Sequence, residues 1–276
     1  MPVALQAILA GFFVAAVSAN VWPLLLLSLG LLPAALVEVL FLAVFLWWAG
    51  GGGPLRAMQA ARASAFRNVD LTRRQWLWGL VAAFFLAATV HASIVLLFRF
   101  VPYPVAAFRQ GYDLSFIPSQ PLRWVAIAIS AASAAICEET GFRGFMQRPI
   151  ELRYGATVAI VVSSFFFMTL HLTKAWALLG MVPIVFGAGV LLGMLAWSAD
   201  SLIPGFIGHF AMDVGLFAYW WTGIAGSFSA RTVQEVGVDR PFLVACFVFA
   251  VSLALALLAI SKLRRSAGTT QRKLPI

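Results

Sequence analysis

Two adjacent glutamates, Glu138 and Glu139, interrupt an otherwise apolar stretch, and Arg143 follows four residues after the second. The apolar run 124–136 leads into them without a turn signal, so we expect all three charges on one helix. Each such charge costs about 2.5–3.5 kcal/mol at the centre of a membrane helix. Glu139 and Arg143 share a helix face and can neutralise each other. Glu138 lies about 100° around the helix without that partner, which makes it the candidate general base.

Two further apolar segments carry histidines. His171 ends the run 165–170, and a hairpin with its turn at about 149–155 would place it at the depth of Glu138 on an antiparallel helix. His209 and Asp213 are four residues apart and therefore share a helix face. Ionisable residues inside membranes usually face the bundle interior or a water-filled cavity, so we expect one intramembrane polar set. Its members are Glu138, Glu139, Arg143, His171, His209 and Asp213.

This set allows two chemistries. In the first, which we favour and which requires no cofactor, Glu138 takes a proton from a water that attacks a peptide carbonyl, and the histidines stabilise the intermediate. In the second, Glu138, His171 and His209 bind Zn²⁺ and the remaining acid activates a bound water. The sequence has no H-E-x-x-H helix. It also lacks a serine in a G-x-S-x context and a pair of intramembrane aspartates, which excludes the serine and aspartyl classes of intramembrane protease.

The composition is that of a membrane protein. Of the 276 residues, 62% are hydrophobic and 11% are charged, whereas a soluble domain has about 25% charged residues. The formal net charge of +9 comes mainly from loops and the C-terminal tail, and we find no nucleic-acid-binding motif. Cys137 and Cys246 both fall in apolar segments and are expected to be free thiols.

The apolar segments predict an all-α polytopic protein, a bundle of about eight transmembrane helices around an intramembrane polar cavity. We expect a single transmembrane domain over residues 1–276. Glu38 is a further charge inside the second segment, and a role at the interface is as plausible as a functional one. The predicted segments are 3–22, 29–49, 76–99, 122–147, 156–173, 176–198, 201–222 and 241–261.

Basic residues gather in the loop 54–75 and in the tail after residue 261. With eight spans, both fall on one side, which the positive-inside rule makes cytoplasmic. We therefore predict an integral protein of a bacterial-type inner (cytoplasmic) membrane, with the N- and C-termini in the cytoplasm. We also expect the cavity to open toward that side.

The three motifs together resemble the motif triplet of the CPBP family, which comprises CAAX prenyl endoproteases and bacteriocin-processing or immunity (Abi-type) membrane proteins. They are Glu138-Glu139-x-x-x-Arg143, Phe167-x-x-x-His171 and His209-x-x-x-Asp213, and the resemblance covers residues 120–222.

The resemblance implies an intramembrane endopeptidase. In it Glu138 activates the water with His171 as its partner, and Arg143 holds Glu139 in place. His209 and the residue at 213 would form the oxyanion site. The family's third motif often ends in Asn, where this chain has Asp213. Because an ionised Asp cannot donate a hydrogen bond to an oxyanion, Asp213 is expected either to orient His209 or to be protonated.

The expected partners are membrane lipids and a peptide or protein substrate, possibly lipidated, and not nucleic acid. The main alternative is non-enzymatic, a membrane scaffold or bacteriocin-immunity protein that keeps the polar set as a structural network. A proton-coupled transporter would also use buried Glu and His, but it predicts broken helices in two symmetric halves, and the sequence has no such symmetry.

Overall fold

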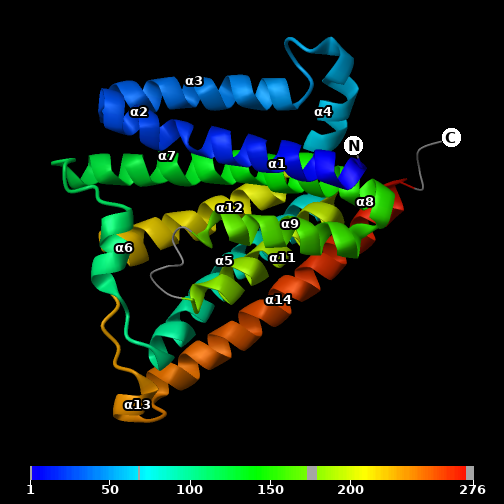
Figure 1. Ribbon diagram of the computed structural model, residues 1–276. Helices are drawn as coiled ribbons and strands as arrows, with labels where there is room; N and C mark the ends of the chain where they lie inside the picture. The colour runs from blue at the N-terminus through cyan, green and yellow to red at the C-terminus, as the bar shows by residue number, and fades with distance from the viewer. Residues whose placement is uncertain (1, 68, 173–178, 272–276) are drawn as a thin grey trace.

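The computed structural model describes residues 2–67, 69–172 and 179–271, and these residues form helices joined by turns, with no strand among them (Figure 1). The longer helices are α1 (Val3–Ala19), α2 (Val21–Leu29), α3 (Leu31–Ala49), α5 (Arg73–Phe100), α7 (Gln120–Glu139), α9 (Ala156–Leu170), α11 (Met181–Ala199), α12 (Ile203–Gly215) and α14 (Arg240–Gln271). Shorter helical segments are η1 (Arg56–Met58), α4 (Gln59–Phe66), α6 (Val105–Gly111), η2 (Thr140–Gln147), α8 (Arg148–Tyr154), η3 (Leu216–Trp221) and α13 (Val233–Val236).

The prediction of an all-α polytopic membrane protein is confirmed. Within the described residues, six helical stretches are long and apolar enough to cross a membrane: α1 with α2, α3, α5, α7 through α8, α11, and α14. The other two predicted spans contain α9 and α12, which are shorter. The 15 residues of α9 extend about 22 Å, less than the ~30 Å of a hydrocarbon core. The last residue of the predicted segment 156–173 and the first three residues of the predicted segment 176–198 lie outside the described residues.

The predicted hairpin turn at 149–155 is wrong in extent, because the helix continues further than expected. α7 passes into the π-helical segment η2 and then into α8, so that residues 120–154 form one helical stretch. Pro149 follows directly on the π-helical segment, in the first turn of α8. The chain turns only at Gly155, whose φ of +86° suits a residue without a Cβ.

α7 is the central helix of the bundle. It runs between a layer formed by α1, α2 and α3 and a group formed by α5, α9, α11 and α12, while α14 packs along α5 (Figure 1). α7 contacts α1 and α3 on one side and α12 on the other. Residues along α7 and η2 can therefore face either the α1–α3 layer or the helices that carry the histidines.

Helix α1 packs closely on η2 through small residues. A Cβ added to Gly141 would lie 2.6 Å from the carbonyl oxygen of Gly11, and one added to Gly11 would lie 2.6 Å from that of Gly141. Ala15 follows Gly11 by one helical turn and is fully buried against the same segment. Such small residues let helix backbones approach inside a membrane. The contact therefore fixes the segment that follows Glu138 and Glu139.

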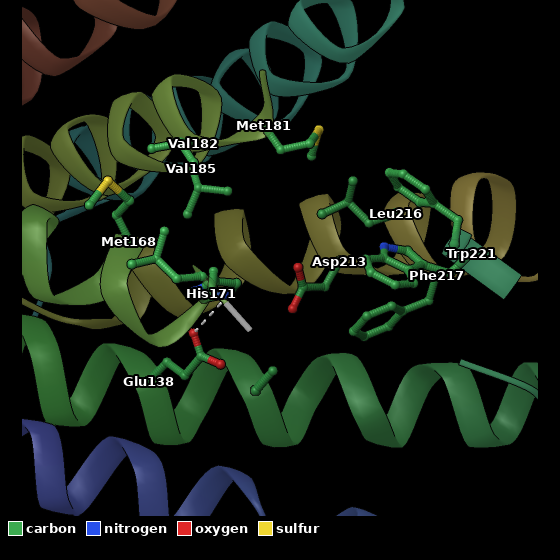
Figure 2. Close-up of a pocket in the computed structure, with 13 residues that line it drawn as sticks. Glu138, Met168, His171, Met181, Val182, Val185, Asp213, Leu216, Phe217 and Trp221 are labelled. Atoms are coloured by element: carbon green, nitrogen blue, oxygen red, sulfur yellow. Dashed lines mark ion pairs between the residues drawn. The ribbon is translucent and has the colours of Figure 1, made fainter. Parts of the chain in front are cut away.

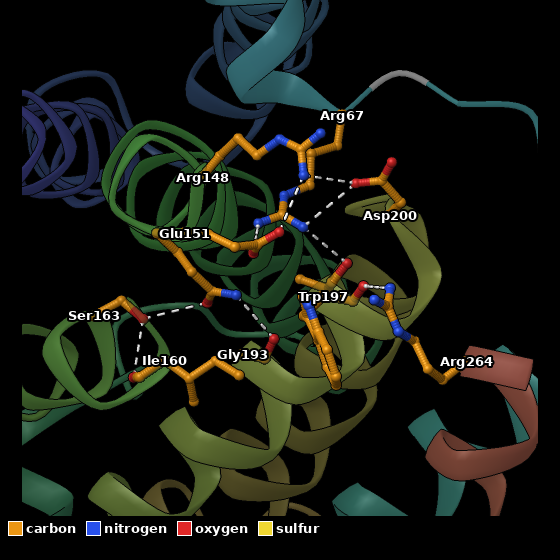
Figure 3. Close-up of polar contacts among 11 residues, drawn as sticks. Arg67, Arg148, Glu151, Ile160, Ser163, Gly193, Trp197, Asp200 and Arg264 are labelled. Atoms are coloured by element: carbon orange, nitrogen blue, oxygen red, sulfur yellow. Dashed lines mark hydrogen bonds and ion pairs between the residues drawn. The ribbon is translucent and has the colours of Figure 1, made fainter. Parts of the chain in front are cut away.

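An ionic network joins three turns at the end of the bundle that carries α4 and α8 (Figure 3). Arg67 and Arg148 both pair with Glu151, at 2.6 and 3.0 Å, and both approach Asp200, at 3.6 and 3.0 Å. Arg67 also donates to the carbonyl of Ala196. Burial lowers the pKa of Arg67, and the charge of Glu151 opposes that shift. The network ties the chain before α5 to α8 and to the turn between α11 and α12.

Two arginines of the predicted basic loop are thus structural rather than solvated. Besides Arg67, Arg62 is 1% exposed and donates to the carbonyl oxygens of Trp48, Gly52 and Pro54. These carbonyls lie at and after the end of α3, where helices leave unsatisfied acceptors. Arg62 therefore fastens α4 to the end of α3.

We expect Gly141→Ala to lower the stability of the protein. The new methyl would overlap the backbone of α1, and overpacking of this kind typically costs about 1–3 kcal/mol. Thermal unfolding in detergent measures the effect. The matched control is Gly187→Ala in α11, where an added Cβ meets no atom within 4 Å. An unchanged melting temperature for Gly141→Ala would contradict the close contact.

Candidate active site

Glu138 and His171 meet at the wall of a cavity, as their spacing predicts (Figure 2). Nε2 of His171 lies 3.9 Å from Oε2 of Glu138. Nδ1 of the same ring donates to the carbonyl oxygen of Phe167 at 2.9 Å, which fixes the orientation of the imidazole. The side chain of Glu138 is 10% exposed and that of His171 is 22% exposed. Both groups are therefore held in place yet accessible from the cavity.

Glu139 faces away from this pair and lies in a buried ionic group. Nη1 of Arg143 lies 3.0 Å from its Oε1, and Nδ1 of His209 donates to the same oxygen at 2.9 Å. The side chains of Glu139 and Arg143 are completely buried. Arg143 also donates through Nη2 to the carbonyl of Gly189 in α11. One carboxylate thus joins η2, α11 and α12.

Asp213 connects the buried group to the cavity. Its Oδ2 lies 3.5 Å from Nε2 of His209, and Asp213 lines the same cavity as Glu138 and His171. With His209 protonated, Glu139, Arg143, His209 and Asp213 carry two positive and two negative charges. Asp213 is the member of this group that reaches the cavity, and whether it orients His209 or is protonated stays a prediction.

Phe167 packs between the charged groups. Its ring lies under the guanidinium of Arg143, with 4.4 Å from Cζ to the ring centroid. The rings of His171 and His209 lie 4.7 and 5.8 Å from it. A cation over an aromatic face is favourable where water is excluded. Phe167 therefore separates His171 from Arg143 and His209 while contacting all three.

A glycine in α12 makes room for the buried group. A Cβ added to Gly205 would lie 3.0 Å from Oε2 of Glu139, so the carboxylate packs directly against the backbone of α12. Pro204 lies in the first turn of α12, where proline is tolerated, and Gly205 after it admits the carboxylate.

The cavity has about 780 Å³ of empty space, including space open to the outside. Apart from Glu138, His171 and Asp213, its described lining is apolar, with Met168, Met181, Val185, Leu216 and Trp221 among the residues (Figure 2). Single apolar residues in apolar helices carry no signal that separates cavity lining from helix packing. The sequence therefore identified the polar wall of the cavity and missed the rest.

The cavity reaches from Glu138 to α6 and η3. Its lining includes Phe108 of α6 and Trp221 of η3, two segments in contact, and α6 lies at the end of the bundle away from α4 and α8 (Figure 1). The length of α9 accounts for this. Because α9 ends at Leu170, the cavity lies where α9 stops, and Met168, His171 and Leu172 line it there. The described lining thus lies toward the α6 end, and the side of the membrane on which the cavity opens stays a prediction.

The residues predicted as zinc ligands are divided between two places. His209 directs its ring nitrogens toward Glu139 and Asp213, whereas Glu138 and His171 face the cavity. No group of three or more His, Cys, Asp or Glu residues in the described part of the chain is arranged to hold a metal ion. In this arrangement Glu138, His171 and His209 do not fit a common zinc site.

The other polar residues noted in the sequence lie outside the site. Glu38 is completely buried in α3 near Ser133, and neither of its carboxylate oxygens accepts a hydrogen bond of ordinary geometry from a described group. The remaining histidine of the chain, His91 in α5, accepts a hydrogen bond from Nε1 of Trp220. Cys137 and Cys246 are free thiols.

Comparison with protein families identifies the central part of the chain. Residues 120–215 match the family described as type II CAAX prenyl endopeptidase Rce1-like. These residues form an Rce1-like domain. The match covers about a third of the chain, includes all six predicted site residues, and confirms the CPBP resemblance. Searches of the curated proteins and of the solved structures returned no match. The match supports a protease-like function for these residues, and the six long apolar helical stretches indicate an integral membrane protein.

We expect Arg143→Leu to destabilise the Rce1-like domain strongly. It removes one partner of a fully buried ion pair, which typically costs about 3–5 kcal/mol because the other charge stays buried. Adding Glu139→Gln should recover part of the loss, since no buried carboxylate then lacks its cation. Thermal unfolding of the single and double variants measures both effects.

Arg153→Leu, at an exposed position in α8, is the matched control. Equal stability of Arg143→Leu and Arg153→Leu would show that the buried pair contributes little.

Proposed function

We propose that this protein is an intramembrane endopeptidase in which Glu138 activates a water molecule for attack on a peptide bond. The observation that carries the proposal is the pair of Glu138 and His171 on the wall of a largely apolar cavity, within an Rce1-like domain. Oε2 of Glu138 accepts no hydrogen bond from the described residues. Because this oxygen is itself buried, we propose that a water entering from the cavity is the partner from which it takes a proton.

The spacing of the pair suits a bridging water. At 3.9 Å, Nε2 of His171 and Oε2 of Glu138 are too far apart for a direct hydrogen bond, and a water can bridge such a gap. Because Nδ1 of His171 donates to Phe167, its Nε2 is the nitrogen directed at that water. We place the nucleophile between these two side chains.

The reaction then follows ordinary acid–base chemistry. Glu138 takes one proton from the water, and the water oxygen bonds to the carbonyl carbon to form a tetrahedral intermediate. When the intermediate collapses, the carbon–nitrogen bond breaks and the leaving amine takes that proton back. Asp213, positioned by His209, lies on the same cavity and is placed to act on the carbonyl oxygen, as a hydrogen-bond donor if it is protonated.

The apolar walls favour a substrate segment that is itself apolar. A peptide or protein segment in the membrane fits this requirement, and a prenylated C-terminal segment is one candidate that the family suggests. We further propose a bacterial-type inner membrane, with the basic end of the bundle and both termini in the cytoplasm. In that orientation the cavity extends toward the opposite side of the membrane.

We expect Glu138→Gln and His171→Ala to lower kcat/KM for peptide cleavage by about 10²–10⁴-fold, the usual contribution of a general acid or base. The assay uses purified protein in detergent with quenched fluorescent peptides, including a farnesylated CAAX peptide and a mixed-sequence library. Thermal unfolding should show that Glu138→Gln retains the wild-type fold, because the residue lines a cavity. Cleavage that persists in both variants would refute the assignment.

Removal of metal separates the two chemistries. We expect cleavage to survive a strong chelator, because the proposed mechanism uses only side chains and water. Loss of activity with the chelator and its recovery on adding zinc would instead assign Glu138 and His171 to a metal site. A folded wild-type protein that cleaves no peptide in the library would favour the non-enzymatic scaffold or immunity role.

A further inference from the structure

The helix that carries Asp213 changes its form shortly after that residue. α12 ends at Gly215 and continues into the π-helical segment η3. Asp213 from α12 and Leu216, Phe217 and Trp221 from η3 line one wall of the cavity (Figure 2). A π-helical turn has longer hydrogen-bonded loops than an α-helical turn, so the point at which η3 begins sets how these side chains face one another. Such segments are rare, and a contact from a neighbouring helix can hold one in place.

His91 in α5 bridges the start and the end of this wall. Nε1 of Trp220 donates to Nδ1 of its ring at 3.3 Å, and the ring also forms a hydrogen bond with the backbone of Met212. Met212 directly precedes Asp213, and Trp220 directly precedes Trp221. Both partners of His91 are buried, so these contacts lie in the packed interior. One side chain of α5 therefore holds the neighbours of two residues that line the cavity.

The backbone at the junction of α12 and η3 packs directly on the same ring. A Cβ added to Gly215 would lie 2.4 Å from Nε2 of His91 and 2.7 Å from its Cε1. Any side chain larger than hydrogen at this position would therefore displace the ring or the helix. This close approach is independent of the two hydrogen bonds. It places the ring at the last residue of α12, where the π-helical segment starts.

The hydrogen bonds determine where His91 carries its proton. An indole N–H can only donate, so Nδ1 must be the acceptor and the neutral ring carries its proton on Nε2. Nε2 faces the backbone of α12, where a carbonyl oxygen can accept it. Both ring nitrogens are thus used in contacts with α12 and η3, and His91 is not part of the described lining of the cavity. It can act on a reaction there only through the residues that it holds.

We propose that His91 is a positioning residue for the reaction, which holds the wall formed by α12 and η3 so that Asp213 and Trp221 keep their places relative to Glu138. The proposal rests on the proposed peptidase function and extends the site to α5. This helix precedes residues 120–215, the part that matches the protease family. The placement of Asp213 would thus depend on a helix outside the matched residues. A hydrogen bond that merely joined two helices would contribute stability without affecting the reaction.

The first experiment compares His91→Leu with His91→Gln. Leucine removes both hydrogen bonds, whereas the amide of glutamine can accept from Trp220 and donate to a backbone carbonyl. With the fluorescent peptides we expect kcat of His91→Leu to fall about 10–100-fold, because a shift of about 1 Å in a catalytic group has an effect of that size. KM should change less, and His91→Gln should recover most of the loss. A wild-type kcat for folded His91→Leu would overturn the proposal.

Thr89→Val is the matched control. Thr89 lies in the same helix and donates to the hydroxyl of Ser252 in α14 at 3.0 Å, so the variant removes a buried hydrogen bond from α5 to a different helix. It should keep the wild-type kcat. If Thr89→Val and His91→Leu lower kcat equally, the effect comes from loosening α5 and the proposal fails.

Trp220→Phe removes the donor instead of the acceptor and takes the place of His91→Leu if that variant does not fold. Phenylalanine keeps an aromatic ring in contact with Phe98 and Tyr103. Its kcat should fall as well, and the double variant with His91→Leu should lose little more than His91→Leu alone, because both changes remove the same hydrogen bond. Losses that add in the double variant, or a wild-type kcat for Trp220→Phe, would contradict the proposal.

The indole N–H resonances test the contact without catalysis. In ¹H–¹⁵N spectra of the protein in detergent, assigned with Trp220→Phe and Trp221→Phe, we expect His91→Leu to shift the indole resonances of both Trp220 and Trp221. Thr89→Val should shift neither. This outcome would support the hold of His91 on the cavity wall even if no peptide is cleaved and the proposed function fails. A shift of Trp220 alone would show that the hydrogen bond does not hold the wall, and the proposal would then be wrong.

Discussion

The buried ion pair of Glu139 and Arg143 is the constraint on which the rest of the site depends. Neither side chain is exposed, and a single unpaired charge in that position would cost several kcal/mol. Further contacts of each member offset the cost of burying the pair. His209 donates to Glu139, and Arg143 donates to the carbonyl of Gly189 and lies over the ring of Phe167. Through these contacts the pair holds α9, α11 and α12 at fixed positions around η2.

The packing outside the site supports this pair from both sides. α1 approaches η2 through Gly11 and Gly141, so the segment that carries Arg143 has no room to move away from α11. At the basic end, Arg67 and Arg148 bind Glu151 and Asp200 and thereby connect α8 to the turn that begins α12. The charged groups at the bundle end and in its centre therefore restrain the same helices.

The helical class and the grouping of the six polar residues could both be predicted from the sequence. A charge in an apolar helix is costly, and each of these residues was therefore expected to have a partner. Four-residue spacing and matched depth then gave the contacts Glu139–Arg143, His209–Asp213 and Glu138–His171. The roles of these residues in catalysis remain predictions. The π-helical segment, the close approach at Gly141 and the direction of the cavity were not predicted. They depend on backbone geometry and on where α9 ends, which apolar residues of similar size do not specify.

The π-helical segment begins directly after the two glutamates, and such segments often occur at functional sites. Successive residues on a helix point about 100° apart, so Glu138 and Glu139 cannot share one environment. Glu139 is neutralised by Arg143 and His209, and Glu138 faces the cavity. A hydrolytic base must be free to accept a proton, whereas a structural carboxylate must stay ionised and bound to its partners. Because Glu138 and Glu139 are neighbours on one helix, the buried pair of Glu139 and Arg143 also holds Glu138 in position. A shift of this helix that displaced Glu138 would break the contacts of Glu139.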